Sequence, residues 1–128
     1  MYTFTKTLSD TSFEEAVTRT REALSAKGFG ILTEIDVKKT MKVKLNADLE
    51  DYMILGACNP AMAYKAIEIE PRVGAMLPCN VIVRSIGDRT VEVSAIDPVA
   101  SMSAISNPEL HAVAGEVAHL LRSVVQAI

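Results

Sequence analysis

A β-hairpin followed by a long helix is the strongest constraint that this sequence places on its fold. Two largely apolar runs, Cys79 to Ile86 and Thr90 to Ile96, flank Gly87-Asp88-Arg89, and a short glycine-containing connection is typical of a hairpin. Asn107-Pro108-Glu109 then begins a helix, because asparagine caps free backbone amides and proline suits the first helical position. This combination favours an α+β layer structure over a doubly wound parallel sheet.

The N-terminal part of the chain predicts a strand, a helix and a second strand. Residues 2–8 alternate between two kinds of side chain, as a half-buried strand does. Ser12 and Glu15 have the spacing of a capping box, which predicts the start of a helix over residues 12–27. The largely apolar residues 29–37 then predict another strand, so the chain begins in the order β-α-β.

Two patterns overlap in the segment that follows. Asp36 can cap a short helix, and Asn46 suits the left-handed position that ends one. Met41, Val43 and Leu45 also alternate as strand residues would, but we favour the helix. The other expected elements are a strand over residues 52–57, a helix over 60–70, a loop over 73–78 and, after the hairpin, a connection over 99–106.

Together these elements predict a single α+β domain over residues 1–128, in the order β-α-β-α-β-α-β-β-α. We expect an antiparallel curved sheet of about five strands with helices packed on one face. Such an arrangement leaves the other face of the sheet uncovered. Because the chain is 49% hydrophobic, an uncovered face predicts a homodimer or a bound ligand.

Composition excludes several classes of protein. The net charge of −3 argues against nucleic-acid binding, which usually needs a clustered basic surface. No apolar run approaches the roughly 20 residues that span a membrane, so we expect no membrane partner. The N-terminus lacks the apolar core of a signal peptide, which predicts a cytoplasmic protein. In that compartment the two cysteines are expected to be free thiols.

Those two cysteines, Cys58 and Cys79, are the residues with the clearest chemical potential. Cys58 directly precedes Asn59-Pro60, a helix start whose partial positive charge favours a thiolate. The helix over 60–70 rises about 15 Å, and residues 71–78 can return roughly 25 Å, so Cys79 can reach the level of Cys58. Chain length allows this approach without requiring it. The pair is therefore either packed as two small hydrophobes or used as reactive or metal-binding thiols.

Several motifs resemble those of the domain-of-unknown-function 302 family. They are Gly56-Ala57-Cys58-Asn59-Pro60, Leu77-Pro78-Cys79-Asn80-Val81, Asp97-Pro98, Gly28-Phe29-Gly30 and Glu34-Ile35-Asp36-Val37. The resemblance implies an α+β fold similar to the TATA-box-binding-protein-like superfold, with subunits that commonly pair as homodimers. It implies no established activity, and likeness in fold to a DNA-binding protein brings no function with it.

Other residues that could bind metals or anions are separated or solvated. His111 and His119 lie on the last expected helix about 12 Å apart along its axis, too far to bind one metal ion. His119 and Glu116 could still face a pocket in a dimer. The methionines have no regular spacing that suggests a copper site, so we interpret them as core residues. A basic cluster is typical of a solvated helix face: Lys38, Lys39, Lys42 and Lys44.

The main functional prediction is a homodimer that binds a small ligand or metal near Cys58 and Cys79. One alternative is a thiol redox or thiol-transfer enzyme with Cys58 as nucleophile and Cys79 as resolving thiol. A second alternative is a structural or adaptor dimer whose cysteines are inert. The sequence contains no Ser-His-Asp order, phosphate loop or catalytic carboxylate pair, so it identifies no cofactor. Four polar residues are candidates for binding the ligand: Asn59, Asn80, Asp36 and Asp97.

Overall fold

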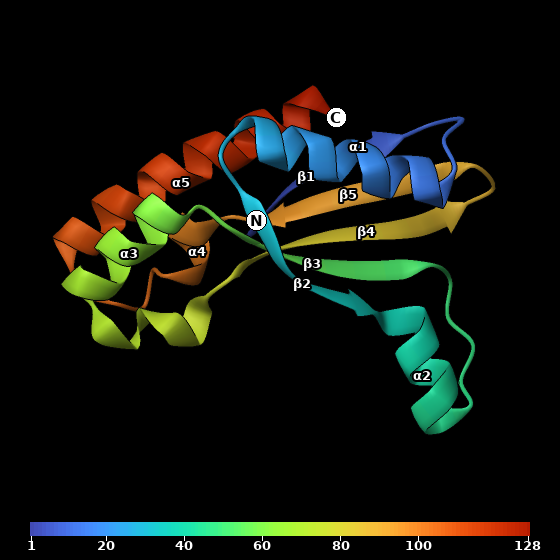
Figure 1. Ribbon diagram of the computed structural model, residues 1–128, viewed down its shortest axis with the longest axis horizontal. Coiled ribbons are helices and arrows are strands. Elements are labelled where there is room, and N and C mark those ends of the chain that lie inside the picture. Colours follow the sequence, from blue (N-terminus) through green and yellow to red (C-terminus); the bar gives the residue numbers. More distant parts are fainter.

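A five-stranded antiparallel sheet with helices on one face forms the protein, which is described here by a computed structural model of residues 1–128 (Figure 1). The strands are β1 (Thr3–Leu8), β2 (Gly30–Asp36), β3 (Tyr52–Cys58), β4 (Cys79–Gly87) and β5 (Thr90–Ile96). The helices are α1 (Phe13–Ala26), α2 (Val37–Leu45), α3 (Pro60–Ile69), the 3-10 helix η1 (Pro71–Met76), α4 (Pro98–Ser101) and α5 (Pro108–Ala127). The strands lie side by side in the order β1-β5-β4-β3-β2. The expected fold class and order of elements are confirmed.

Every α-helix starts with a residue whose side chain caps it, which explains why the starts of the longer helices can be predicted from nearby residues. The Asn59 side chain accepts a hydrogen bond from the Met62 amide at the start of α3. Asn107 accepts from the amides of Glu109 and Leu110 at the start of α5. The ambiguous segment after β2 is a helix, as expected. The remaining caps are Ser12, Asp36 and Asp97.

Two short helices lie where the sequence predicts irregular chain. Residues 71–76, within and before the expected loop, form η1. Helix α4 begins at Pro98, directly before the expected connection over residues 99–106, and continues into it. Proline stands at the start of both, where its fixed φ favours a helical turn and its missing N–H removes no helical hydrogen bond. Neither segment is long enough to show a helical repeat, so periodicity alone does not reveal them.

The hydrophobic core lies between the sheet and the two longest helices, α1 and α5 (Figure 1). Val81, Val83 and Val93 are fully buried on the covered face of the sheet. The C-terminal end of α5 is held to β1, since Lys6 Nζ donates hydrogen bonds to the carbonyl oxygens of Gln126 and Ile128 at 3.0 and 2.6 Å. The buried side chains of α5 are Leu110, Val113, Ala114, Val117, Ala118, Leu121, Val124 and Val125.

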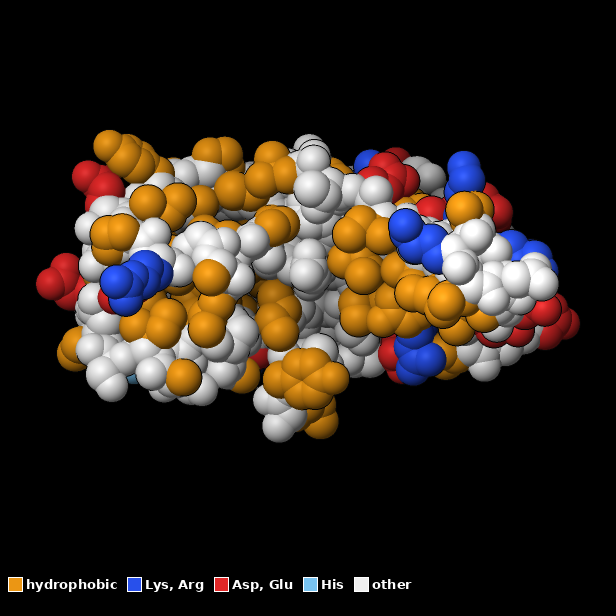
Figure 2. Space-filling model, turned by 90° about the horizontal axis from the view of Figure 1, so that it is seen from below, with side chains coloured by type: hydrophobic (Ala, Val, Ile, Leu, Met, Phe, Trp, Pro, Cys, Tyr) orange, Lys and Arg blue, Asp and Glu red, His pale blue; other side chains and the backbone are white.

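The opposite face of the sheet carries a row of isoleucines. Ile35, Ile54 and Ile82 are directly paired across β2, β3 and β4, so their side chains share one face. Ile35 is 46% exposed. Figure 2 shows hydrophobic side chains gathered in a patch beside α2, with lysine and arginine side chains at its borders. We call the three paired residues the isoleucine row.

Helix α2 projects from the sheet at the end of β2 (Figure 1). None of its residues is buried, and Val43 and Leu45 are 76% and 70% exposed. Isolated helices of this length are marginal in water, so contacts must hold it in place. Two exposed ion pairs tie it to the segment before β3, Lys38 with Asp51 at 3.4 Å and Lys42 with Asp48 at 3.0 Å.

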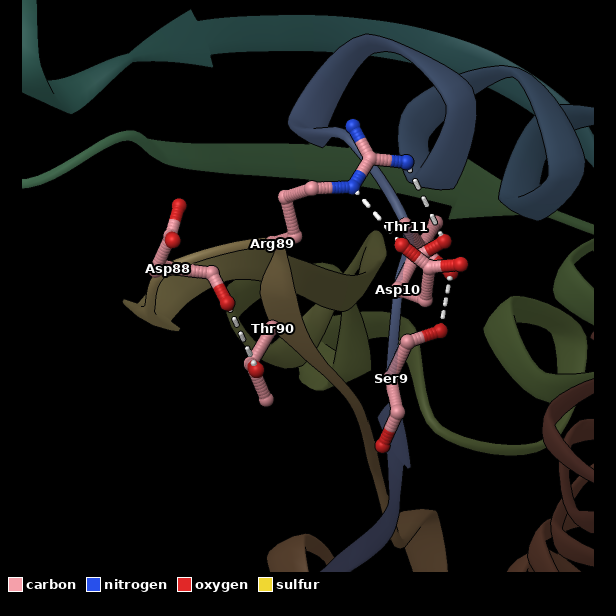
Figure 3. Close-up of polar contacts among 6 residues, drawn as sticks. All are labelled: Ser9, Asp10, Thr11, Asp88, Arg89 and Thr90. Atoms are coloured by element: carbon pink, nitrogen blue, oxygen red, sulfur yellow. Dashed lines mark hydrogen bonds and ion pairs between the residues drawn. The ribbon is translucent and has the colours of Figure 1, made fainter.

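At the far end of the sheet, the β4–β5 turn is joined to the loop between β1 and α1 (Figure 3). Arg89 Nε donates to Asp10 Oδ1 at 2.8 Å, and the Thr11 amide donates to the Arg89 carbonyl at 2.9 Å. The hydrogen bond from Arg89 to Asp10, followed by the carboxylate's charge, raises the pKa of the guanidinium. The side chains are exposed, so this contact positions the turn and adds little stability.

Candidate functional site

A small cavity lies at the end of the sheet where β3 leads into α3 and β4 begins. Its volume is about 30 Å³, which leaves room for a ligand of only a few atoms. Its wall is mostly hydrophobic, and Asn59 is the only lining residue with a side-chain nitrogen or oxygen. The N-terminal half of α5 covers it through Leu110, Val113, Ala114 and Val117.

Both cysteines line this cavity, at the end of the β3–β4 pairing. Ala57 of β3 pairs directly with Cys79 of β4, so the backbone of Cys58, the next residue of β3, lies beside that of Cys79 at the end of the sheet. Antiparallel strand spacing and the rise per residue put their Cα atoms about 6 Å apart. Both residues line the cavity, and both are free thiols. The approach that chain length allows is therefore present in the fold.

The environments of the two thiols differ. Cys79 is 7% exposed, whereas Cys58 is half-buried. Burial, and to a lesser extent the neighbouring Cys58, raises the pKa of the Cys79 thiol to about 11. Cys79 is thus a neutral thiol at pH 7, and its sulfur is the less available of the pair.

Asn59 fixes the turn that carries Cys58. Its side-chain oxygen accepts from the Met62 amide at 3.3 Å, and its backbone carbonyl accepts from Ala63 at 2.9 Å. Its side-chain nitrogen would lie 3.4 Å from a Cβ atom at Gly28, where φ is +82°. Because Pro60 has no N–H, Ala61 is the one residue of the first turn whose amide has no acceptor within the protein. The amide of Asn59 also has no acceptor within the protein, so two free amides remain near Cys58, fewer than the four of a bare helix N-terminus.

Two methionines add further sulfur atoms to the wall. Met62 comes from α3, and Met102 follows α4 and is 3% exposed. The cavity therefore has four sulfur-bearing side chains from four places in the chain, Cys58, Met62, Cys79 and Met102. Along the sequence the methionines are irregularly spaced, which predicts core residues and not a metal site. Only the tertiary fold brings these two together, so no local spacing could have identified them.

Of the four polar candidates, Asn59 alone lines the cavity. Asn80 pairs with Gly56 on the strands and is exposed. The Asp36 side chain accepts from the Lys39 amide at 3.0 Å and caps α2, at the other end of β2 from the Cys58 pairing. The Asp97 side chain accepts from the Val99 amide at 3.0 Å and caps α4, next to the lining residue Pro98. Both carboxylates thus have structural roles as helix caps.

The histidines lie on α5 outside the cavity. His111 Nε2 is 2.5 Å from the Ile105 carbonyl oxygen. His119 and Glu116 line a shallow groove beside α3, and Met62 belongs both to this groove and to the cavity. Nowhere in the protein do three or more His, Cys, Asp or Glu side chains gather closely enough to hold a metal ion. No helix is long and apolar enough to cross a membrane.

Comparison with known proteins identifies the family. The family described as domain of unknown function DUF302 matches residues 4–128. The chain belongs to the DUF302 family. A solved structure, the crystal structure of an uncharacterized conserved DUF302 protein from Bacillus stearothermophilus, is similar with a TM-score of 0.86 and 25% sequence identity. The similarity covers 97% of each chain, and no curated protein matches.

Proposed function

We propose that this DUF302 protein is a binding module that takes a very small ligand into the cavity beside Cys58 and Cys79. The observation that carries the proposal is that both thiols line one cavity whose wall is otherwise almost entirely apolar. Polar groups in such a wall determine which ligand is held and how it is oriented. The two thiols, with Asn59 beside them, are the groups that can play this part.

The size of the cavity restricts the class of ligand. Sites for drug-sized molecules usually enclose roughly 300–1,000 Å³. At about 30 Å³, this cavity accepts an ion or a molecule of a few atoms. The proposal therefore concerns a ligand bound through the sulfur atoms rather than one that fills a large pocket.

Paired substitutions on α3 test the proposal. Ala63 lines the cavity, whereas Ala61 on the same helix is exposed and does not. Native mass spectrometry of protein purified from its own host should show a bound species in the wild type. Ala63→Leu should lose it because the longer side chain fills the space, while Ala61→Leu should keep it. Equal occupancy in both variants, or no bound species in the wild type, would contradict the proposal.

The presence of both free cysteines at one cavity favours a second candidate, a thiol-exchange enzyme. The Cys58 thiolate would attack a low-molecular-weight disulfide and release one thiolate, forming a mixed disulfide. Cys79 would then lose its proton and attack the Cys58 sulfur, releasing the second thiol and leaving a Cys58–Cys79 disulfide. Incubation with oxidised glutathione tests this, since two equivalents of glutathione should appear for each protein disulfide formed. A stable mixed disulfide at Cys58, or no reaction, argues against the thiol-exchange enzyme. If both thiols react only after the protein unfolds, the result favours the structural or adaptor alternative.

The proposed partner is a second copy of the chain, bound through the uncovered sheet face. The isoleucine row and the exposed Val43 and Leu45 of α2 offer apolar surface that a partner would bury. Ile54→Lys places a charge in the middle of this row and should shift the dimer to monomer in sedimentation. Ala61→Leu, on a surface away from the sheet, is the control. A wild-type monomer at micromolar concentration would refute the dimer.

We also propose a cytoplasmic location. Free cysteines that line one cavity persist as thiols where glutathione and thioredoxin keep them reduced. Fractionation of the native host, with the thiol state of Cys58 and Cys79 trapped by alkylation during lysis, tests this location.

A further inference from the structure

The donor set of the cavity identifies a ligand class more narrowly than its size does. We propose that the cavity binds a single Cu(I) ion between the Cys58 and Cys79 thiolates, with thioether sulfur from Met62 or Met102 completing the coordination. The inference rests on the proposed binding function and names its ligand. It depends on four sulfur-containing residues, two cysteines and two methionines, lining one cavity of about 30 Å³.

Sulfur chemistry separates Cu(I) from the other metals that cysteine binds. Thiolates and thioethers are soft ligands, and soft ligands select Cu(I), zinc or iron–sulfur clusters. Structural zinc usually takes four Cys or His ligands, and iron–sulfur clusters usually take four cysteines. This protein brings together only two cysteines, with no third His, Cys, Asp or Glu ligand beside them. Two thiolates assisted by thioethers suit Cu(I), which accepts a low coordination number and binds methionine sulfur.

The surroundings of the sulfur atoms fit a small, weakly hydrated cation. The wall offers apolar side chains in place of water, so a bound ion keeps only sulfur ligands. Binding converts two neutral thiols into thiolates, and the two protons leave to solvent as Cu(I) enters. The complex of one Cu(I) ion with two thiolates carries one negative charge. That charge lies at the N-terminal end of α3, where the partial positive charge of the helix favours an anion.

An entry route is present beside the cavity. Met62 stands between the cavity and the open groove that contains Glu116 and His119. Methionine is unbranched and flexible, so its side chain can turn between the two spaces. An ion that first contacts His119 or Glu116 in the groove would pass Met62 to reach the thiols. Met62 is therefore expected to affect the rate of uptake as well as affinity.

Anaerobic competition with bathocuproine disulfonate, a coloured Cu(I) chelator, tests the inference on the whole protein. The wild type should remove one equivalent of Cu(I) from the chelator. Cys58→Ser and Cys79→Ser should each lower the affinity by about 100-fold or more, since each removes a charged ligand. Met62→Leu and Met102→Leu preserve volume, and at least one should lower it by about tenfold. Met53→Leu, a packed methionine outside the cavity, is the control and should bind as the wild type does.

X-ray absorption of the loaded protein gives an independent reading of the ligands. Only sulfur neighbours should surround the copper in the wild type. Nitrogen or oxygen neighbours, no competition with the chelator, or unchanged affinity in the double Cys58→Ser/Cys79→Ser variant would overturn the assignment. Suppose that the protein does not bind Cu(I), but that native mass spectrometry shows a bound species in the wild type and in Ala61→Leu that Ala63→Leu lacks. The binding function then stands and the copper assignment fails. If neither result is obtained, both fail.

Discussion

The alkylation rate of Cys79 is the most direct measure of the environment at the cavity. Its thiol is 7% exposed, and its pKa is raised from the usual 9.0 to about 11. Because only the thiolate reacts, a shift of about two pH units lowers the reactive fraction at pH 8 by about 100-fold. Restricted access lowers the rate further. In the Cys58→Ser variant the contribution of Cys58 to this shift is absent, but burial, the larger cause, remains. Cys79 should therefore react with iodoacetamide many-fold more slowly than an unhindered cysteine of ordinary pKa, and the shifted pKa accounts for up to about 100-fold of this.

The pH profile separates the shifted pKa from simple obstruction. Below pH 11 the rate should rise about tenfold for each pH unit, because each unit increases the thiolate fraction tenfold. An obstructed thiol of ordinary pKa would instead level off near pH 9. The same variant unfolded in guanidinium chloride supplies the reference rate for Cys79 without its surroundings. A folded rate equal to this reference at pH 8, or a plateau near pH 9, would refute the argument.

Three further predictions concern stability. Asn59→Ala and Asn107→Ala each remove a helix cap and should each cost about 1 kcal/mol in urea denaturation, and unchanged midpoints would show that these caps carry no stability. Gly56→Ala should destabilise the protein by about 1–3 kcal/mol, because the added Cβ would overlap the Thr33 hydroxyl and lie 2.7 Å from Pro78 Cγ. The control is Gly115→Ala, at an exposed position of α5. Its added Cβ meets no atom within 4 Å, so this variant should be more stable by roughly 0.5–1 kcal/mol. Because the pKa of Cys79 is raised in the folded state, its contribution to the free energy of unfolding is complete below pH 9 and is lost as the pH rises toward 11. Across that interval the free energy of unfolding of the wild type should fall by up to roughly 3 kcal/mol relative to that of Cys79→Ala. Parallel curves of unfolding free energy against pH for the two proteins would contradict this linkage.

The elements that could be predicted from sequence are those with signals close together in the chain. Ser12 and Glu15 identify the start of α1 because a cap bonds an amide three residues away. Asn46 ends α2 with φ of +51°, the left-handed conformation expected of it. Each signal involves residues close together in the sequence, so it does not depend on the tertiary packing of the chain. The same reasoning fails for η1 and α4, which are too short to display a period.

The candidate site could be predicted only in part, because its residues meet through long-range packing. The helix start at Asn59-Pro60 identifies Cys58 and Asn59 as candidates, and the strand that begins at Cys79 identifies the second cysteine. Met62 lies four residues after Cys58, but Met102 reaches the cavity only because α4 packs beneath α5. The isoleucine row likewise depends on the pairing of three strands, which local patterns do not determine.

Two prolines explain why the sulfur atoms gather at this end of the sheet. Pro60 follows Cys58 by two residues, and Pro78 directly precedes Cys79, so neither proline can donate to the strand ladder. The β3–β4 pairing therefore stops at Ala57 and Cys79, and the chain leaves the sheet on both sides of the cavity. Helices α3 and α4 begin beyond this limit and turn Met62 and Met102 toward the same space. The four sulfur-containing residues thus line the cavity from segments at or just beyond the end of the β3–β4 pairing.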